Sequence, residues 1–145
     1  MLHRNKKPND VHEGKWNGLG GKLEAGESPE ECALREIREE SGLEVHQLAY
    51  KGFIAFPHFD GTNDWHVHVY LAEVFPGECK PCDEGELAWV ENEKIPSLSL
   101  WEGDRIFLPW LDGPNFFSAK FIYRSGKLVT HQVTFYPARP LAATL

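Results

Sequence analysis

Residues 21–43 read GKLEAGESPEECALREIREESGL, and this stretch determines how the rest of the chain is interpreted. Its second half carries the signals of a helix. Ser28 is a natural N-cap, and Glu31 completes a capping box with it. Gly42 is suited to end the helix just past its last turn. The pattern predicts a helix over 29–41.

Three carboxylates share one face of this predicted helix, because Glu36, Glu39 and Glu40 stand at positions i, i+3 and i+4. Like charges at this spacing repel by a few tenths of a kcal/mol per pair, so we expect a positive charge nearby to offset the repulsion. A hard divalent cation such as Mg²⁺ takes oxygen ligands and usually also holds phosphate oxygens. The alternative is a solvated acidic face with ion pairs to Arg35.

The spacing of the whole stretch narrows this choice. Gly21 lies six residues before Glu27, Glu27 lies eight before Arg35, and REIREESGL follows without a gap. Together they match G-x5-E-x7-R-E-U-x-E-E-x-G-U, where U is a bulky aliphatic residue. Seven fixed residues would coincide by chance roughly once in 10⁸–10⁹ positions. The stretch is the Nudix box, and the chain resembles a Nudix hydrolase.

The resemblance implies an α/β (α+β) fold, an α/β/α sandwich around a mixed β-sheet. In the family the glutamates of the box bind a divalent metal, as does the carbonyl of its first glycine. The resemblance gives these roles to Gly21, Glu36, Glu39 and Glu40. It also implies that Glu27 and Arg35 form a structural ion pair. The implied cofactor is Mg²⁺, for which Mn²⁺ can substitute.

Many family members add a further acid from a later loop, and Glu84 matches this position five residues before Trp89. Glu84 therefore joins the three box glutamates as a candidate catalytic residue. A plain acidic surface loop is the alternative for this segment. The metals of the family bridge phosphates, neutralise developing charge and activate or position a water.

Outside the box, the resemblance narrows to MutT-like enzymes that act on oxidised purine nucleotides, the 8-oxo-dGTP diphosphatases. The segment 14–22, GKWNGLGGK, is similar to the one that enters the box in those enzymes. There an Asn hydrogen-bonds the purine edge, which implies this role for Asn17, since an amide both donates and accepts. Lys22 is a further candidate for substrate binding. A turn-stabilising Asn beside Gly18 is the alternative for Asn17.

The segment 100–104, LWEGD, is similar to the family segment whose Trp stacks on the base and whose acids read its edge. Trp101 and Asp104 match, whereas Gly103 stands where some relatives have another acid. Phe56 is a candidate for the wall of the same pocket. Packing in the core is the alternative for both aromatic residues.

The function implied is Mg²⁺-dependent hydrolysis of 8-oxo-dGTP, or of a similar oxidised purine triphosphate, to the monophosphate and pyrophosphate. Such an enzyme keeps damaged precursors out of DNA. One alternative is a Nudix pyrophosphohydrolase of another nucleotide, such as an ordinary triphosphate or ADP-ribose. The other is a non-catalytic Nudix domain that binds a nucleotide.

The remaining elements follow from composition and periodicity. Aromatic and β-branched runs predict strands, and apolar residues at helical spacing predict a second helix over 104–111. The predicted strands are 48–57, 65–75, 88–90, 116–123 and 128–136. The last two form a hairpin turned at Ser125-Gly126.

A chain of 145 residues fits one domain over 1–145, with a C-terminal tail at 137–145. A net charge of −7 argues against a nucleic-acid polymer as partner, and no apolar run is long enough for a membrane span. Three cysteines and the lack of a signal sequence suggest a cytoplasmic protein. The expected partner is a small nucleotide, and the expected state a monomer or homodimer. Relatives carry an N-terminal strand before the segment that matches Met1–Arg4, so the expectation is either that this strand is absent or that the start has been placed at an internal Met.

Overall fold

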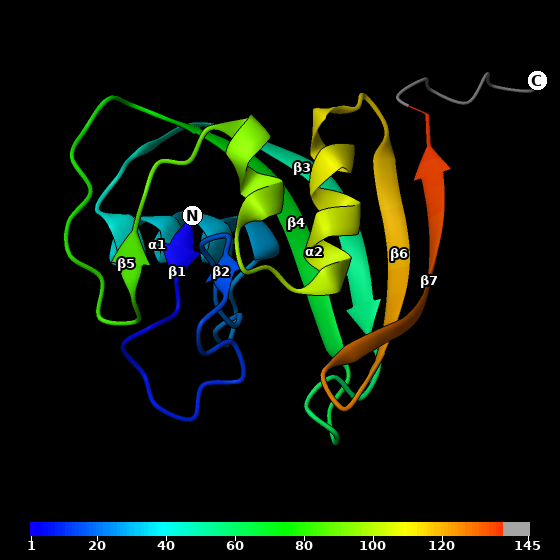
Figure 1. Cartoon of the computed structure of the whole chain (residues 1–145). Helices are drawn as coiled ribbons and strands as arrows, with labels where there is room; N and C mark the ends of the chain where they lie inside the picture. Colours follow the sequence, from blue (N-terminus) through cyan, green and yellow to red (C-terminus); the bar gives the residue numbers. More distant parts are fainter. Residues whose placement is uncertain (138–145) are drawn as a thin grey trace, which may run out of the picture. The chain divides into compact units, whose positions relative to one another are not determined.

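The computed structural model describes residues 1–137, so of the predicted tail only Pro137 is described. The elements are β1 (Leu2–His3), β2 (Trp16–Asn17), α1 (Pro29–Ser41), β3 (Val45–Phe56), β4 (Trp65–Val74), β5 (Glu86–Leu87), η1 (Asn92–Ser97), α2 (Glu102–Phe107), η2 (Leu108–Asp112), β6 (Phe116–Arg124) and β7 (Lys127–Tyr136) (Figure 1). The symbols η1 and η2 denote 3₁₀ helices. Within the described part, no helix has the length and apolar character needed to cross a bilayer.

The chain divides into two compact units. The first comprises Met1–Ala49 and Ala72–Arg105, and the second comprises Tyr50–Leu71 and the described residues from Ile106 onward. A single domain over 1–145 stays a prediction. Nearly every candidate site residue belongs to the first unit, and Phe56 belongs to the second.

The first unit contains a small sheet in the order β2-β1-β5, with β1 antiparallel to both neighbours (Figure 1). Leu2 pairs with Asn17 on one side and with Leu87 on the other, and its side chain is buried. The prediction of a strand at 88–90 was wrong. The register aligns Glu86 and Leu87 with β1 instead, and Trp89, just beyond, is largely exposed.

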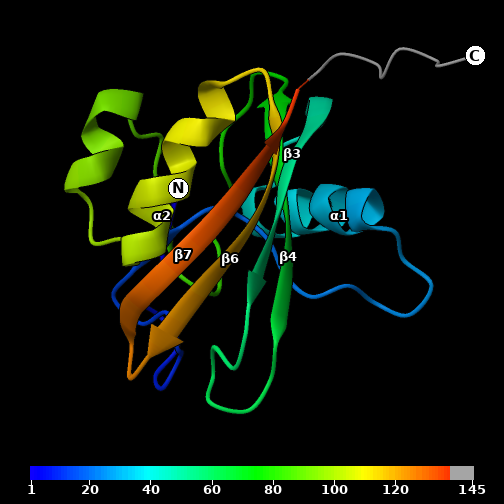
Figure 2. The same ribbon diagram turned by 90° about the vertical axis from the view of Figure 1, so that its right-hand side faces the viewer.

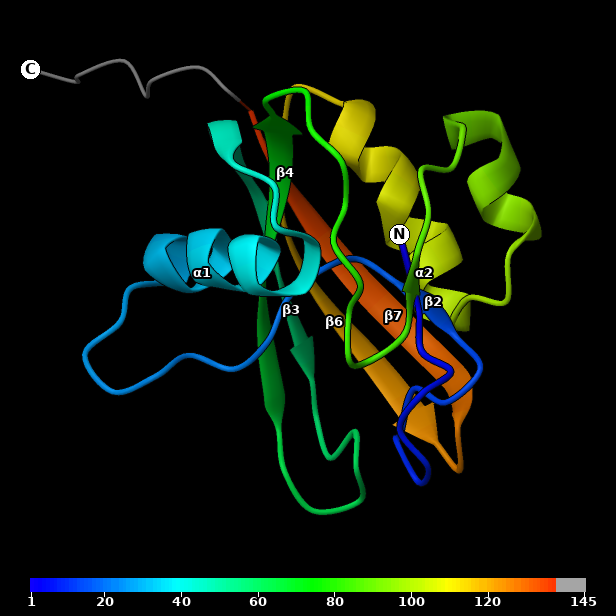
Figure 3. The same cartoon turned by 90° about the vertical axis from the view of Figure 1, so that its left-hand side faces the viewer.

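Helix α1 begins and ends where the sequence predicted. The Glu31 N–H donates to Ser28 Oγ at 3.1 Å, and the Ser28 N–H donates to the Glu31 carboxylate at 2.8 Å. Pro29 occupies the first helical position, where its missing N–H costs no hydrogen bond. Gly42 ends the helix with a φ of 74°, in the left-handed region that favours glycine. Figure 3 shows the long loop that leads from β2 into the first turn of α1.

The second unit is built on the sheet β4-β3-β6-β7. Strand β3 runs parallel to β6, with Gly52 opposite Phe117, and β6 runs antiparallel to β7, so the sheet is mixed. Figure 2 shows β6 and β7 side by side along their length. The predicted turn is confirmed, because Ser125 and Gly126 have φ values of 50° and 74°, as a tight hairpin turn requires.

Aromatic side chains fill the core of the second unit. Phe117 and Phe121 are fully buried, and the Trp110 ring packs on Phe117 at a centroid distance of 5.2 Å. The single helix predicted over 104–111 was wrong in its second half, since α2 gives way to a 3₁₀ turn after Phe107. Pro109 explains the change, because it has no N–H to donate to the preceding turn.

Candidate active site

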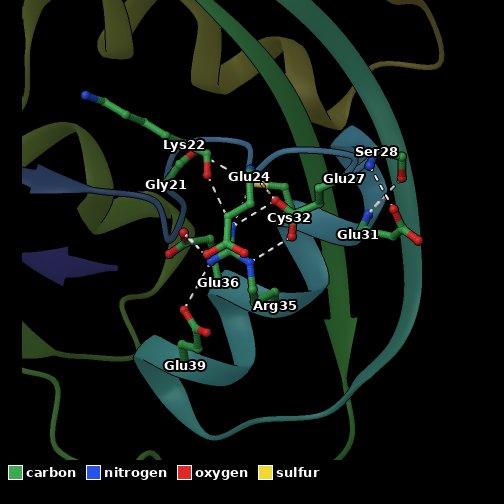
Figure 4. Close-up of polar contacts among 10 residues, drawn as sticks. All are labelled: Gly21, Lys22, Glu24, Glu27, Ser28, Glu31, Cys32, Arg35, Glu36 and Glu39. Atoms are coloured by element: carbon green, nitrogen blue, oxygen red, sulfur yellow. Dashed lines mark hydrogen bonds and ion pairs between the residues drawn. The ribbon is translucent and has the colours of Figure 1, made fainter.

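The guanidinium of Arg35 organises the acidic face of α1 (Figure 4). It binds Glu27 through two hydrogen bonds, Nε to Oε1 at 2.7 Å and Nη2 to Oε2 at 3.0 Å. Its Nη1 donates to Glu36 at 2.7 Å and to Glu39 at 3.1 Å. Its Nη2 also donates to the Lys22 carbonyl at 3.2 Å, which ties the preceding loop to the helix.

The hydrogen bonds from Arg35 lower the pKa of Glu27 to about 2, and the Glu24 N–H that donates to the same carboxylate acts in the same direction. In turn, the bonds to Glu27 and Glu36 raise the pKa of Arg35. This pair is therefore ionised over the whole useful pH range. The paired geometry agrees with the structural role that the resemblance implied for Glu27 and Arg35.

Gly21 lies with its backbone directly against the carboxylate of Glu36. A Cβ built on Gly21 would collide with both carboxylate oxygens of Glu36. A side chain at position 21 would therefore displace the Glu36 carboxylate, so the glycine serves the close approach of the backbone to the acidic face and not an unusual φ. The loop and the helix are thus in contact at Gly21 and Glu36.

Glu40 differs from its neighbours because it is buried, with 6% of its surface exposed. Its Oε2 accepts a hydrogen bond from the Gly20 N–H at 2.9 Å. Burial and, to a lesser extent, the charges of Glu36 and Glu84 raise the pKa of Glu40 to about 7 against the effect of that hydrogen bond. A carboxyl group held among other carboxylates in this way would gain from a nearby cation.

Glu84 is held by two cations from the N-terminal loop, a contact that the sequence did not reveal. Its carboxylate forms ion pairs with Arg4 and Lys7, and Arg4 also pairs with Asp10 at 2.6 Å. Arg4 lies 80 positions from Glu84 in the chain, so no local pattern could have predicted the contact. Glu84 is thereby fixed in place at the N-terminal loop.

The donor set of the acidic face fits a hard divalent cation, because every candidate ligand offers oxygen. Among the described residues, however, no three His, Cys, Asp or Glu side chains already surround one point where a metal could sit. Arg35 accounts for this, since its Nη1 draws the carboxylates of Glu36 and Glu39 toward itself. Each carboxylate uses one oxygen in its bond to Arg35, Oε1 of Glu36 and Oε2 of Glu39.

A second group of candidates lies around β2. Trp16 stacks on His3 at a centroid distance of 4.8 Å, so Lys15 and Asn17 project to the other side of the strand. On that side, Lys15 Nζ lies 5.3 Å from the centroid of the Trp101 ring. The charge of Lys15 also acts to lower the pKa of Asp104. Lys15 thus interacts with two predicted base-binding residues, Trp101 and Asp104, and a third, Asn17, lies two positions further along the chain.

Asn17 carries the one buried side-chain oxygen or nitrogen without a hydrogen-bond partner within the part of the chain that the structure describes, its Oδ1. An unsatisfied buried acceptor costs roughly 1–3 kcal/mol, so a native structure keeps one only for a reason. A ligand N–H that donates to this oxygen would remove the cost. This observation favours the ligand-binding interpretation of Asn17 over the turn-stabilising one.

Asp104 is half-buried at the start of α2. Burial raises its pKa to about 7, although the charges of Lys15 and Arg105 act in the opposite direction. At neutral pH the carboxyl group is therefore divided between the neutral form, which can donate a hydrogen bond, and the ionised form, which only accepts.

The contacts described for two further predicted residues do not join them to these groups. The Lys22 side chain points away from Arg35 and the box carboxylates (Figure 4). Phe56 belongs to the second unit, where its ring packs on Phe121 at 5.8 Å and on Phe59 at 5.5 Å. The described contacts of Phe56 are those of a core residue, the alternative that the sequence left open.

A model of the NUDIX domain family matches residues 1–111 of the chain. A protein of Danio rerio named oxidized purine nucleoside triphosphate hydrolase is 41% identical over 96 residues, which cover 66% of this chain and 62% of the relative. A protein of the same name from Mus musculus is 37% identical over 98 residues, covering 68% and 63%. The chain thus spans less than two thirds of the length of these curated relatives.

Among solved structures, the MutT protein from Bacillus halodurans matches with a TM-score of 0.76 and 30% sequence identity. The match covers 88% of this chain and 86% of that protein. The likeness confirms the predicted fold class, a mixed α/β fold around a mixed sheet.

Proposed function

The chain belongs to the Nudix family, and we propose that it hydrolyses an oxidised purine nucleoside triphosphate to the monophosphate and pyrophosphate. The leading candidate substrate is 8-oxo-dGTP. The observation that carries the proposal is the buried Oδ1 of Asn17, which has no hydrogen-bond partner among the described residues. The names of the relatives from Danio rerio and Mus musculus support the same class of substrate.

The base-binding group matches the chemistry of an oxidised purine. In guanine, N7 is a hydrogen-bond acceptor on the major-groove edge of the base. Oxidation at C8 turns N7 into an N–H donor beside a new carbonyl. Asn17 Oδ1 can accept from such a donor, and Asp104 can donate when neutral or accept when ionised. Stacking of the base on Trp101 would add about 1–3 kcal/mol.

At the phosphate end, Nudix hydrolases need a divalent metal, and we propose Mg²⁺ with Glu36, Glu39, Glu40 and the Gly21 carbonyl as ligands. A bound cation of this kind neutralises charge on the phosphates and lowers the pKa of a water. Glu27 would hold Arg35 in place beside these ligands through its ion pair. Glu84 would add one more carboxylate, which Arg4 and Lys7 hold in position.

The substrates of Nudix hydrolases are small nucleotides, and this agrees with the expected partner. A monomer or homodimer remains the prediction for the oligomeric state.

The test is pyrophosphate release with Mg²⁺, comparing 8-oxo-dGTP with dGTP, dATP and ADP-ribose at low concentration. We expect a large preference in kcat/KM for 8-oxo-dGTP and no turnover in EDTA. Asn17→Ala should reduce that preference, whereas Asn5→Ala, which changes an exposed residue of the N-terminal loop, should not. Equal kcat/KM for all four nucleotides would refute the substrate, and metal-independent turnover would refute the chemistry.

A further inference from the structure

His12 lies against the edge of Trp101, although it has no place in the Nudix box. The Trp101 Nε1–H donates to His12 Nδ1 at 2.9 Å, and the two rings meet edge to face with centroids 6.0 Å apart. The residues are 89 positions apart in the chain, so the contact is a tertiary one. An indole has a single N–H and no acceptor, so a fixed acceptor at its edge defines how the ring is rotated.

A second restraint acts on the face of the same ring. Lys15 Nζ lies 5.3 Å from the centroid of Trp101, within the range of a cation–π contact. The ammonium also donates to the Leu100 carbonyl at 3.4 Å, next to Trp101 in the chain. The indole is thus restrained at its edge by His12 and on one face by Lys15.

The loop that carries His12 is itself held. The His12 N–H donates to Asp10 Oδ1 at 3.0 Å, and Asp10 Oδ2 accepts from Arg4 Nε at 2.7 Å. The ends of the loop are joined by hydrogen bonds from Arg4 N–H to the Lys15 carbonyl, 2.8 Å, and from Gly14 N–H to the Arg4 carbonyl, 2.7 Å. The imidazole is therefore placed before any ligand arrives.

The contact also needs an unprotonated ring nitrogen on His12. Burial lowers the pKa of His12, and the charge of Arg4 acts in the same direction, while the charges of Asp10 and Glu84 act against it. A neutral imidazole keeps one nitrogen as an acceptor, as the bond from Trp101 requires.

We infer that His12 is a positioning residue for purine recognition, which holds the Trp101 indole in the orientation against which a base stacks. The role of Trp101 in this inference rests on the proposed function, whereas the hydrogen bond to His12 does not. Stacking needs nearly parallel planes in contact, so a change in the tilt of the indole weakens it directly. His12 thus acts on the substrate only through Trp101.

The first test is the indole N–H spectrum of the ¹⁵N-labelled protein, in which Trp101→Phe identifies the Trp101 signal. His12→Leu should shift that signal, and His12→Asn, whose side-chain oxygen can replace Nδ1 as acceptor, should largely restore it. His3→Leu is the matched control, because it removes a ring stacked on Trp16 and leaves Trp101 untouched. An unchanged Trp101 signal in His12→Leu would overturn the inference.

The second test is titration with 8-oxo-dGTP in EDTA, which measures binding without turnover. His12→Leu should weaken binding by about three- to tenfold, the range expected for one hydrogen bond, and His12→Asn should recover most of the loss. With Mg²⁺, the same variants should change KM and leave kcat nearly constant. A shifted indole signal with unchanged affinity would also overturn the inference. A wild-type protein that neither binds nor hydrolyses 8-oxo-dGTP would instead overturn the proposed function, and the base-binding role of His12 with it.

Discussion

Asp104 should make the stability of the protein fall as the pH rises from weakly acid to neutral. Its pKa is 3.8 in an ordinary environment and about 7 in the folded chain. Between these two values the native state keeps a proton that the unfolded state has lost. The free energy of unfolding therefore decreases with rising pH in this window, and the decrease is complete above about pH 7.

The magnitude follows from the pKa of about 7. For each pH unit between the two pKa values, the proton held by Asp104 changes the free energy of unfolding by about 1.4 kcal/mol. Between pH 5 and pH 8, Asp104 therefore lowers the free energy of unfolding by about 2–3 kcal/mol. In Asp104→Asn this pH-dependent loss of unfolding free energy is absent, because an amide does not ionise. The variant should lose less stability than the wild type over the same interval.

The assay is urea denaturation of wild type and Asp104→Asn at several pH values between 5 and 8. Glu40, whose pKa is also raised to about 7, contributes in the same direction to both proteins and cancels in the comparison. Asp83→Asn, a change at an exposed aspartate of the same unit, should keep the wild-type slope. An Asp104→Asn slope equal to that of the wild type would show that Asp104 is ionised throughout, and the argument would fail.

Three further predictions concern α1 and the loop before it. Glu39→Gln should reduce kcat by at least about a hundredfold in the pyrophosphate assay. The fold should be unchanged, because the Glu39 side chain is largely exposed. The control Glu44→Gln should have little effect on kcat. Gly21→Ala should push the Glu36 carboxylate aside and lower both kcat/KM and the affinity for Mn²⁺, which EPR measures. Gly18→Ala is the control, because an added Cβ there meets nothing within 4 Å. Equal losses in the two variants would contradict the steric explanation. Ser28→Ala should lower the free energy of unfolding by about 1 kcal/mol in urea, through loss of the N-cap, with kcat nearly unchanged.

The parts of the fold that local chemistry defines were predicted well from the sequence. The N-cap at Ser28, the left-handed Gly42 and the Ser125-Gly126 turn each depend on residues within a few positions of one another. The strand at 88–90 failed because its limits are set by pairing with β1, far away in the sequence. The second half of the helix at 104–111 was wrong because the apolar period of α2 continues past Phe107, whereas its α-helical hydrogen bonding changes to that of a 3₁₀ helix.

The candidate site shows the same division. The spacing of the box located the carboxylates and Arg35, which lie on one helix or in the loop before it. The contacts of Arg4 with Glu84 and of His12 with Trp101 join positions 80 and 89 residues apart, so no pattern in the sequence could indicate them. The unpaired oxygen of Asn17 is likewise visible only when its surroundings are known.

The ion pairs of Arg35 also bear on how folding and metal loading are related. The guanidinium is an internal counter-ion that Glu27, Glu36 and Glu39 share, so part of the negative charge of the acidic helix is compensated within the chain itself. A zinc finger has no such substitute and unfolds when its metal is removed. Here a chelator should stop turnover while the secondary structure and cooperative unfolding remain. We therefore expect the metal-free protein to stay folded and to gain activity when the cation is added.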